Sequence, residues 1–282
     1  MNRRKTAPPR GVLRTAAADP QRYQHARYHA SPDLEAYVEH YWSVQWDLRG
    51  LAPERVETLP HPSVHMIFER PAGGRIAGVA RGKFSRLLEG EGGAFSAKFT
   101  PGGFHPFAGG PVSGFTDRVA TLGEVFGAKG QELERAVLVE RDDASRIAIV
   151  EDFLRACRPE PDDHVARVAE IVYAVAGDRR ILKVEDLVDR YAINQRTLQR
   201  LFAKYVGVSP KWVIQRYRLH EAAEQLASGV AVSQSALALD LGYTDQAHFV
   251  HDFKTVVGTS PAAYARAARV ARLTPREAPR SD

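Results

Sequence analysis

The spacing of apolar and polar positions divides the chain into a β-type part and a helical part. Beyond Trp42, short β-prone pieces separated by Gly and Pro predict strands at SVHMIFE, RIAGVARG, FSRLLEG and AFSAKFTP. The Gly- and Pro-rich stretch FTPGGFHPFAGGPVSGF predicts a structured loop. From ATLGEVFG onward, apolar residues recur at the helical period. We therefore expect an α+β fold, with a β-rich amino-terminal domain and an all-α carboxyl-terminal domain.

Composition sets the expected limits of these domains. The first thirty residues are basic and have no apolar periodicity, which predicts a disordered tail. Ser31 followed by Pro32 predicts a helix N-cap where ordered structure begins. The polar, proline-interrupted segment RPEPDD predicts a linker. The expected organisation is a basic tail (1–30), an amino-terminal domain (31–157), a linker (158–163), a helical domain (164–270) and a disordered tail (271–282).

The helical domain contains two copies of one small unit. A short helix, a tight turn, a second helix and a Gly-x-Ser-Pro exit occur as KVEDLVDRYA/INQRTLQRLFAKYVGVSP and again as VSQSALALDLG/YTDQAHFVHDFKTVVGTSP. Asn194 is the expected N-cap of one second helix, and Thr244 or Asp245 that of the other. Ser209 and Ser260 precede proline and are also expected N-caps. A long helix linking the two copies completes a domain of two helix-turn-helix units.

A helical wheel separates a core face from a polar face in each second helix. The core faces consist of Leu198, Leu201, Phe202 and Tyr205, and of Phe249, Phe253, Val256 and Val257. Arg and Gln lie on the opposite face of the first helix, and their paired donors and acceptors fit guanine and adenine edges in a major groove. A packed inner face, a tight turn and a polar outer face together are typical of DNA binding by a helix-turn-helix.

Two stretches carry a specific resemblance. RTLQRLFAKYVGVSPKWVIQRYRL (196–219) and LALDLGYTDQAHFVHDFKTVVGTSP (237–261) are similar to the double helix-turn-helix domain of AraC/XylS-family transcription regulators. The resemblance implies recognition helices at 194–206 and 245–257, with a rigid linker helix at 209–228. Carried over by position, the base-reading residues are Arg196, Gln199, Arg200, Gln246, His248 and His251.

The expected mechanism follows from the spacing of the recognition helices. A rigid linker can hold them about 34 Å apart, so that both enter successive major grooves of double-stranded DNA. Family members often carry arginine where His251 stands, so we expect a weaker, pH-sensitive contact there. The turn YAIN has Ala192 in place of the common glycine, and we expect Ala192 to fit. The expected phosphate contacts are Lys204, Lys211, Arg216, Arg218 and Lys254.

The amino-terminal domain resembles an uncharacterised domain found ahead of such regulators. The segments YVEHYWSVQWDL, LPHPSVHMIFE, GKFSRLLEGEG and KFTPGGFHPFAGGPVSGFTDRV carry this resemblance. It implies a β-rich module that senses a small-molecule effector or mediates homodimerisation. RNA polymerase is a further expected partner of a regulator of this kind.

A metal-dependent, cupin-like enzyme is the alternative for this domain. If the strand SVHMIFE extends back through His61, then His61, His65 and Glu69 point to one face, and His105 could join them. Two histidines and a carboxylate are ligands for zinc or non-haem iron. The flanking residues Pro60 and Pro62 disfavour that strand geometry.

Charge and cysteine content narrow the function classes further. The net charge of +5 divides into +6 for residues 1–30, −6 for 31–163 and +5 for 164–282, so we expect only part of the chain to face a polyanion. The one cysteine, Cys157, is expected to be a buried small hydrophobe. That interpretation disfavours a DNA-repair protein with an alkyl-accepting cysteine, the second alternative. An architectural DNA binder without an effector stays open.

Signals for membrane insertion, secretion and catalysis are missing from the sequence. No apolar run is long enough to span a membrane, and the amino end lacks the apolar stretch of a secretory signal, so we expect a cytoplasmic protein. G-x-S-x-G, the P-loop and the dinucleotide glycine fingerprint are also missing. We therefore expect a regulator that is not an enzyme and needs no cofactor.

Overall fold

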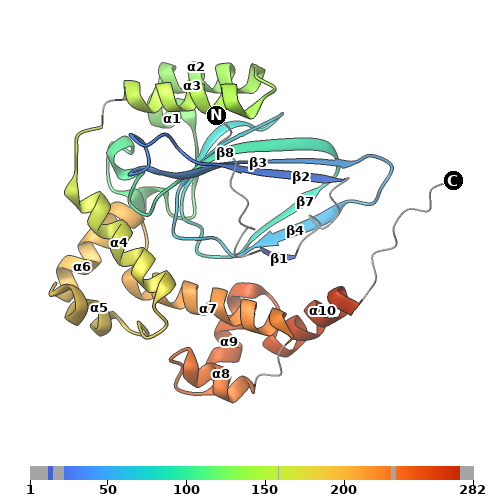
Figure 1. The fold of residues 1–282 in the computed structure, drawn as a ribbon, viewed down its shortest axis with the longest axis vertical. Helices are drawn as coiled ribbons and strands as arrows, with labels where there is room; N and C mark the ends of the chain where they lie inside the picture. Colours follow the sequence, from blue (N-terminus) through green and yellow to red (C-terminus); the bar gives the residue numbers. More distant parts are fainter. Residues whose placement is uncertain (1–11, 15–21, 158, 230–232, 274–282) are drawn as a thin grey trace. The chain divides into compact units, whose positions relative to one another are not determined.

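The computed structural model describes residues 12–14, 22–157, 159–229 and 233–273. Its amino-terminal part is built from two antiparallel sheets (Figure 1). The larger sheet has the strand order β2-β3-β8-β5-β6-β9, and the smaller has the order β1-β4-β7. The strands are β1 Val12–Arg14, β2 Tyr23–Tyr28, β3 Val38–Leu48, β4 Glu54–Thr58, β5 His65–Glu69, β6 Gly73–Ala77, β7 Phe84–Leu88, β8 Gly90–Phe99 and β9 Val119–Thr121.

The helices follow the strands along the chain. Two 3-10 turns, η1 His105–Phe107 and η2 Val112–Phe115, lie in the segment that was expected to be a structured loop. The helices are α1 Leu122–Phe126, α2 Ala128–Val139, α3 Asp143–Ala156, α4 Asp163–Gly177, α5 Val184–Tyr191, α6 Gln195–Leu201, the π-helical turn η3 Phe202–Val206, α7 Pro210–Ser228, α8 Gln234–Asp240, α9 Gln246–Val257 and α10 Pro261–Leu273. The predicted α+β fold is confirmed.

The larger sheet is covered on both faces. Successive side chains of a strand point to opposite faces of the sheet, and apolar side chains lie on both. On one face, Tyr41, Phe68 and Phe95 pack in a single core that also includes side chains of α2 and α3. On the other face, Trp46 and Leu88 belong to a smaller cluster between the two sheets. Figure 1 shows α2 and α3 on one side of the sheet and β4 and β7 on the other. The amino-terminal part therefore has three layers.

Two sequence-based expectations about the start of the domain are wrong. Residues 23–28 form β2, which pairs with β3 from Tyr23 opposite Trp46 to Tyr28 opposite Tyr41, so they are not part of a disordered tail. Residues 32–37 form turns instead of the predicted helix, and a strand follows at once. Of the rest of the expected tail at 1–30, the structure describes only β1, Arg22, His29 and Ala30, and Ala30 is buried in the core.

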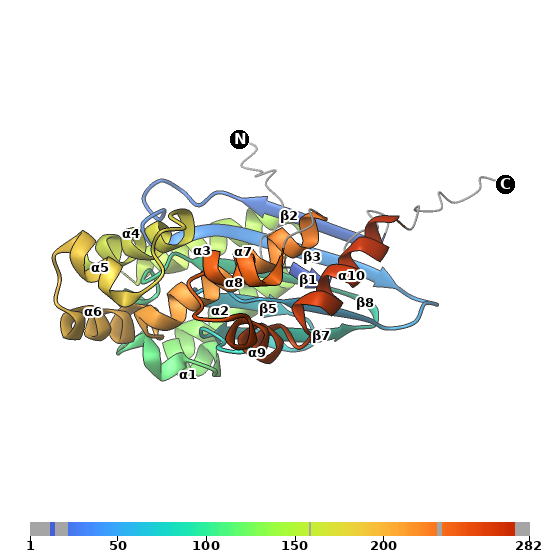
Figure 2. The ribbon, with the colours of Figure 1, turned by 90° about the horizontal axis from the view of Figure 1, so that it is seen from below.

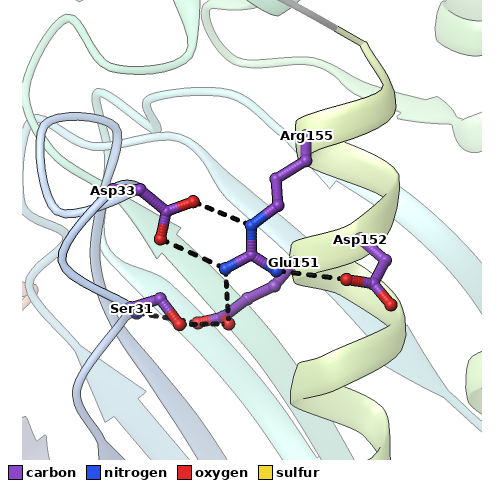
Figure 3. Close-up of polar contacts among 5 residues, drawn as sticks. All are labelled: Ser31, Asp33, Glu151, Asp152 and Arg155. Carbon is purple, nitrogen blue, oxygen red and sulfur yellow. Dashed lines mark hydrogen bonds and ion pairs between the residues drawn. The ribbon is translucent and has the colours of Figure 1, made fainter.

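Ser31 does not cap a helix, because a side chain from far along the sequence binds it. The Ser31 N–H donates to Glu151 Oε1 at 2.8 Å, and its hydroxyl donates to Glu151 Oε2 at 2.5 Å. Glu151 lies on α3 and is 4% exposed. Arg155, one turn further along α3, donates to both carboxylate oxygens of Asp33 at 2.7 and 3.1 Å (Figure 3). The connection between β2 and β3 is thus fastened to α3.

The chain forms two compact units that divide inside α7. The first, Met1–Ile214, contains both sheets and α1 to α6, and the second, Gln215–Asp282, contains α8 to α10. In both views α4, α5 and α6 lie together beside one end of the larger sheet (Figures 1 and 2). The expected boundary at 158–163 therefore does not coincide with the division into compact units, since the first helix-turn-helix packs with the amino-terminal domain.

Two further features concern the surface and the ends of the helices. Cys157 is exposed at the carboxyl end of α3, so the prediction of a buried side chain is wrong. Its neighbours Arg155 and Ala156 are exposed too, whereas Leu154 in the same turn of α3 is fully buried. None of the helices in the described ranges is long and apolar enough to cross a membrane. Residues 274–282 of the expected carboxyl-terminal tail lie outside the described residues.

Candidate DNA-binding surface

The first helix-turn-helix consists of α5, a tight turn and α6. Ala192 ends α5 in the left-handed conformation, with φ +46° and ψ +43°. Asn194 then caps α6, because its side chain accepts a hydrogen bond from the Thr197 N–H at 2.8 Å. Both local predictions for this turn are confirmed. The turn brings α6 out of α5 within three residues.

Strain at Ala192 leads to a stability prediction. A left-handed conformation costs an L-residue about 1 to 2 kcal/mol, whereas glycine adopts it freely. Glycine also loses more entropy on folding, which offsets about 0.4 to 1 kcal/mol. We therefore expect Ala192→Gly to raise the free energy of unfolding by roughly 0.5 to 1 kcal/mol. Thermal unfolding of both proteins checks this, and an unchanged or lower Tm would contradict it.

The two faces of α6 differ in the way that base reading requires. Leu198 and Phe202 are fully buried on the inner face, and they hold the helix against the rest of its unit. Arg196, Gln199 and Arg200 are exposed on the outer face. Among the residues that the structure describes, none donates to or accepts from these three side chains. They are therefore available to a ligand without loss of an internal contact.

The second helix-turn-helix consists of α8, a turn at Gly242 and α9. Gly242 has φ +80°, which fits its predicted role in the turn. Asp245 is the N-cap of α9, since its carboxylate accepts from the His248 N–H at 2.8 Å. Phe249 and Phe253 are fully buried on the inner face. The exposed residues of the outer face include Gln246, His248, His251 and Lys254.

Two of the predicted base-reading side chains in α9 already have partners. Gln246 Oε1 accepts from the Ser235 hydroxyl of α8 at 2.6 Å. His248 Nε2 lies 3.6 Å from Asp252 Oδ2, and its ring packs edge-on against Tyr243 at 5.3 Å. These contacts would have to be exchanged for contacts with a base. The outer face of α6 therefore has fewer internal contacts to give up on binding DNA than the outer face of α9.

The predicted phosphate contacts divide into an exposed and a buried group. Lys204, Lys211 and Lys254 are exposed. Arg216 and Arg218 on α7 are each 2% exposed, and Arg218 Nη1 donates to Glu221 at 2.8 Å. Burial lowers the pKa of Arg216 to about 10. In this conformation neither guanidinium can reach a phosphate, so the prediction does not fit these two residues.

The residues of the metal-site alternative have other partners. His65 and Glu69 share one face of β5, but the buried Glu69 carboxylate accepts from Arg75 at 2.7 Å and from Arg86 at 2.6 Å. His105 instead packs against Tyr205 at 4.3 Å between ring centroids. No group of three or more His, Cys, Asp or Glu that could hold a metal ion occurs within the described ranges. The geometry gives the cupin-like enzyme no support.

Burial of His65 predicts a pH dependence of stability. Desolvation, aided by the charges of Lys98 and His40, lowers its pKa from 6.5 to about 3, although Glu39 opposes this. As the pH falls below 6.5, the unfolded chain binds a proton at this residue that the folded protein does not bind. The contribution of His65 to the free energy of unfolding is therefore expected to decrease by at most about 1.4 kcal/mol per pH unit.

The variant His65→Gln isolates this effect, since glutamine can still accept the weak hydrogen bond from Trp42 Nε1 at 3.4 Å. Denaturant unfolding between pH 6.5 and 5 avoids the range in which carboxylates titrate. We expect a smaller loss of stability for the variant than for the parent over this interval. Equal losses would contradict the prediction.

The sequence did not indicate one contact at the end of α6. The Thr116 hydroxyl, which follows η2 in the amino-terminal domain, donates to the Gly207 carbonyl at 2.6 Å. These residues are 91 positions apart, and although Gly207 begins the first Gly-x-Ser-Pro exit, nothing in that motif points to Thr116. Hydrophobic periodicity reports local structure and has no signal for such a contact.

In a comparison with known proteins, two parts of the chain match known sequence families. Residues 187–267 match a family described as a helix-turn-helix domain, and residues 26–121 match a family described as a domain of unknown function (DUF6597). An uncharacterised helix-turn-helix-type transcriptional regulator of Haemophilus influenzae is 32% identical over 81 residues, which cover 29% of this chain and 27% of that protein.

Two further matches are with proteins named as AraC-type regulators. A putative AraC-like transcription regulator of Streptomyces lividans is 36% identical over 81 residues, covering 29% of this chain and 26% of that protein. The chain thus spans about a quarter of the length of these curated relatives. The solved structure of a probable AraC family transcriptional regulator from Rhodopseudomonas palustris is 25% identical and covers 35% of this chain and 93% of that one, with a TM-score of 0.32.

Proposed function

We propose, from the premise that this chain carries an AraC-type helix-turn-helix domain, that it is a transcription regulator that binds double-stranded DNA sequence-specifically. The observation that carries the proposal is the outer face of α6. Its Arg196, Gln199 and Arg200 are exposed and have no internal partners in the described structure, on a helix whose inner face is fully packed. Such side chains pair with guanine and adenine edges in a major groove.

In the proposed mechanism, α6 and α9 both act as recognition helices. Asn194 and Asp245 fix the amino-terminal turns of these helices, and those turns contact base edges when a helix-turn-helix docks. Lys204, Lys211 and Lys254 contact phosphates and orient the protein without reading sequence. α9 makes the weaker contact, because its glutamine and one histidine must first leave their internal partners.

In vitro selection of DNA fragments by the purified protein tests this proposal. We expect the enriched sequences to contain two short boxes about one helical turn apart, the spacing that two recognition helices on one face of the duplex require. An architectural DNA binder would enrich no sequence and would lose affinity steeply with salt. RNA polymerase contact and homodimerisation remain predictions that this selection does not address.

We further propose that the amino-terminal domain binds a small-molecule effector in a trough of about 580 Å³. Phe68 and Phe95 contribute apolar surface to its lining. Arg70 and Arg141 also line it, and both are exposed without a side-chain partner in the described part of the chain. This lining suits a ligand with an apolar body and an anionic group. Repeating the DNA selection with amphipathic carboxylates tests it, and unchanged enrichment and affinity would contradict it.

A further inference from the structure

A segment of the amino-terminal domain packs on η3, the π-helical turn that continues α6. The segment, residues 101–116, contains η1 and η2 and overlaps the stretch 99–115, which was expected from sequence only to be a structured loop. Its Thr116 hydroxyl donates to the carbonyl of Gly207, which terminates the π-helical turn η3. Its His105 ring meets Tyr205 of η3 edge-on, at 4.3 Å between centroids. Both contacts lie inside the first compact unit.

Tyr205 links η3 to a second helix of the same unit. Its side chain is 2% exposed, and its hydroxyl donates to Asp162 Oδ2 at 2.6 Å. Asp162 also caps α4 by accepting from the His164 N–H at 3.0 Å. Burial and the bond to Asp162 raise the pKa of Tyr205, so the phenol keeps its proton as a donor. The π-helical turn η3, which continues α6, is therefore held both by α4 and by residues 101–116.

The space around Gly207 shows how close this packing is. Gly207 has φ +92°, a conformation that side chains other than glycine rarely adopt. A Cβ atom at this position would lie 2.9 Å from Thr116 Oγ1 and 3.1 Å from the Val112 carbonyl oxygen. The preceding helix departs from α geometry here, and π-helical turns occur frequently at functional sites. The contact therefore depends on backbone geometry as well as on the hydroxyl.

We propose that Thr116 is a positioning residue for DNA recognition, through which the amino-terminal domain fixes the orientation of α6. The proposal rests on the proposed base-reading role of α6. The amino-terminal domain is then a structural part of the first DNA-reading unit. The Gly207 carbonyl ends the same continuous run of helix that presents Arg196, Gln199 and Arg200. A change in the 101–116 segment can reach these side chains through the Thr116–Gly207 hydrogen bond and the His105–Tyr205 contact.

Three variants of the full-length protein test the proposal. Thr116→Val removes the donor but keeps the shape, and Thr116→Ser keeps the donor. Ser113→Ala is the matched control, because Ser113 lies exposed in the same segment. For Thr116→Val we expect about fivefold weaker binding to the selected DNA site, the scale of one hydrogen bond, with binding to random DNA nearly unchanged. Thr116→Ser and Ser113→Ala are expected to bind like the parent.

Other results would overturn the proposal. A Thr116→Val protein that loses thermal stability while keeping its preference for the selected site would assign Thr116 a structural role only. Equal losses for selected and random DNA would also exclude a role in orienting α6. Failure of rescue by Thr116→Ser would show that the hydroxyl is not the relevant group.

A second measurement separates this proposal from the proposed function. Hydrogen–deuterium exchange of the parent and of Thr116→Val reports the order of residues 195–207 without DNA. We expect faster exchange there in the variant, with α4 unchanged. If the parent protein enriches no DNA sequence, the proposed function fails. Faster exchange in Thr116→Val would still support a role of Thr116 in ordering α6. Unchanged exchange in residues 195–207 would show that Thr116 does not order α6, whichever DNA the protein binds.

Discussion

Replacing Arg200 by alanine is expected to weaken binding to the selected DNA site by roughly 1 to 3 kcal/mol and to relax the base preference at one position. The guanidinium is exposed on α6 and has no partner in the described structure. Its removal therefore breaks no internal contact. A bidentate pair with a base edge would be lost in full. Binding titrations with the selected site and with single-base variants of it measure both effects.

Two control variants separate base reading from the loss of positive charge. Arg135→Ala removes the same charge from an exposed position on α2 and is expected to leave DNA binding almost unchanged. Lys204→Ala removes an exposed cation that we assign to a phosphate. This variant is expected to bind all DNA sequences more weakly by the same factor. The slope of log K against log salt concentration is expected to fall by about one, since one counterion fewer is released. If Arg200→Ala behaved like Lys204→Ala, Arg200 would contact the backbone and would not read bases.

The caps and turns of the two helix-turn-helix units were predictable because their signals are local. Asn194 and Asp245 bind N–H groups three residues further along, and Ala192 and Gly242 occupy tight turns between adjacent helices. Each of these interactions is contained within a few residues of sequence. The buried stripe around Phe202 was predictable for the same reason, since helical periodicity is local too.

The failed predictions concern contacts and burial that the local sequence does not indicate. Ser31 preceding Pro32 is a good helix start in isolation, but Glu151, 120 residues away, binds both its N–H and its hydroxyl. Arg216 and Arg218 lie on a long helix, and the sequence of that helix alone does not indicate which of its polar positions are buried. The strand β2 was missed because Tyr23 is buried by packing with Trp46, Leu48 and Leu88, which lie in other strands.

Replacing Glu151 by alanine is expected to destabilise the protein by about 3 kcal/mol. The carboxylate is buried and accepts from the N–H and hydroxyl of Ser31, while Arg155 Nη2 lies 3.3 Å away (Figure 3). Its removal leaves both Ser31 donors without this acceptor, and an unsatisfied buried group costs about 1 to 3 kcal/mol. Since 1 kcal/mol shifts the Tm of a domain of this size by about 2 to 4 °C, we expect a decrease of roughly 6 to 12 °C.

The adjacent residue Asp152 supplies the matched control. It lies on the same turn of α3, its side chain is 78% exposed, and it contacts Arg155 at 3.1 Å. Exposed ion pairs contribute less than about 1 kcal/mol, so Asp152→Ala is expected to lower the Tm by only a few degrees. Glu151→Gln keeps one oxygen for the Ser31 N–H, so its Tm is expected to lie between those of Glu151→Ala and Asp152→Ala. If Glu151→Ala unfolded at the same temperature as Asp152→Ala, the connection between β2 and β3 would be held by the sheet alone, and α3 would contribute nothing to its position.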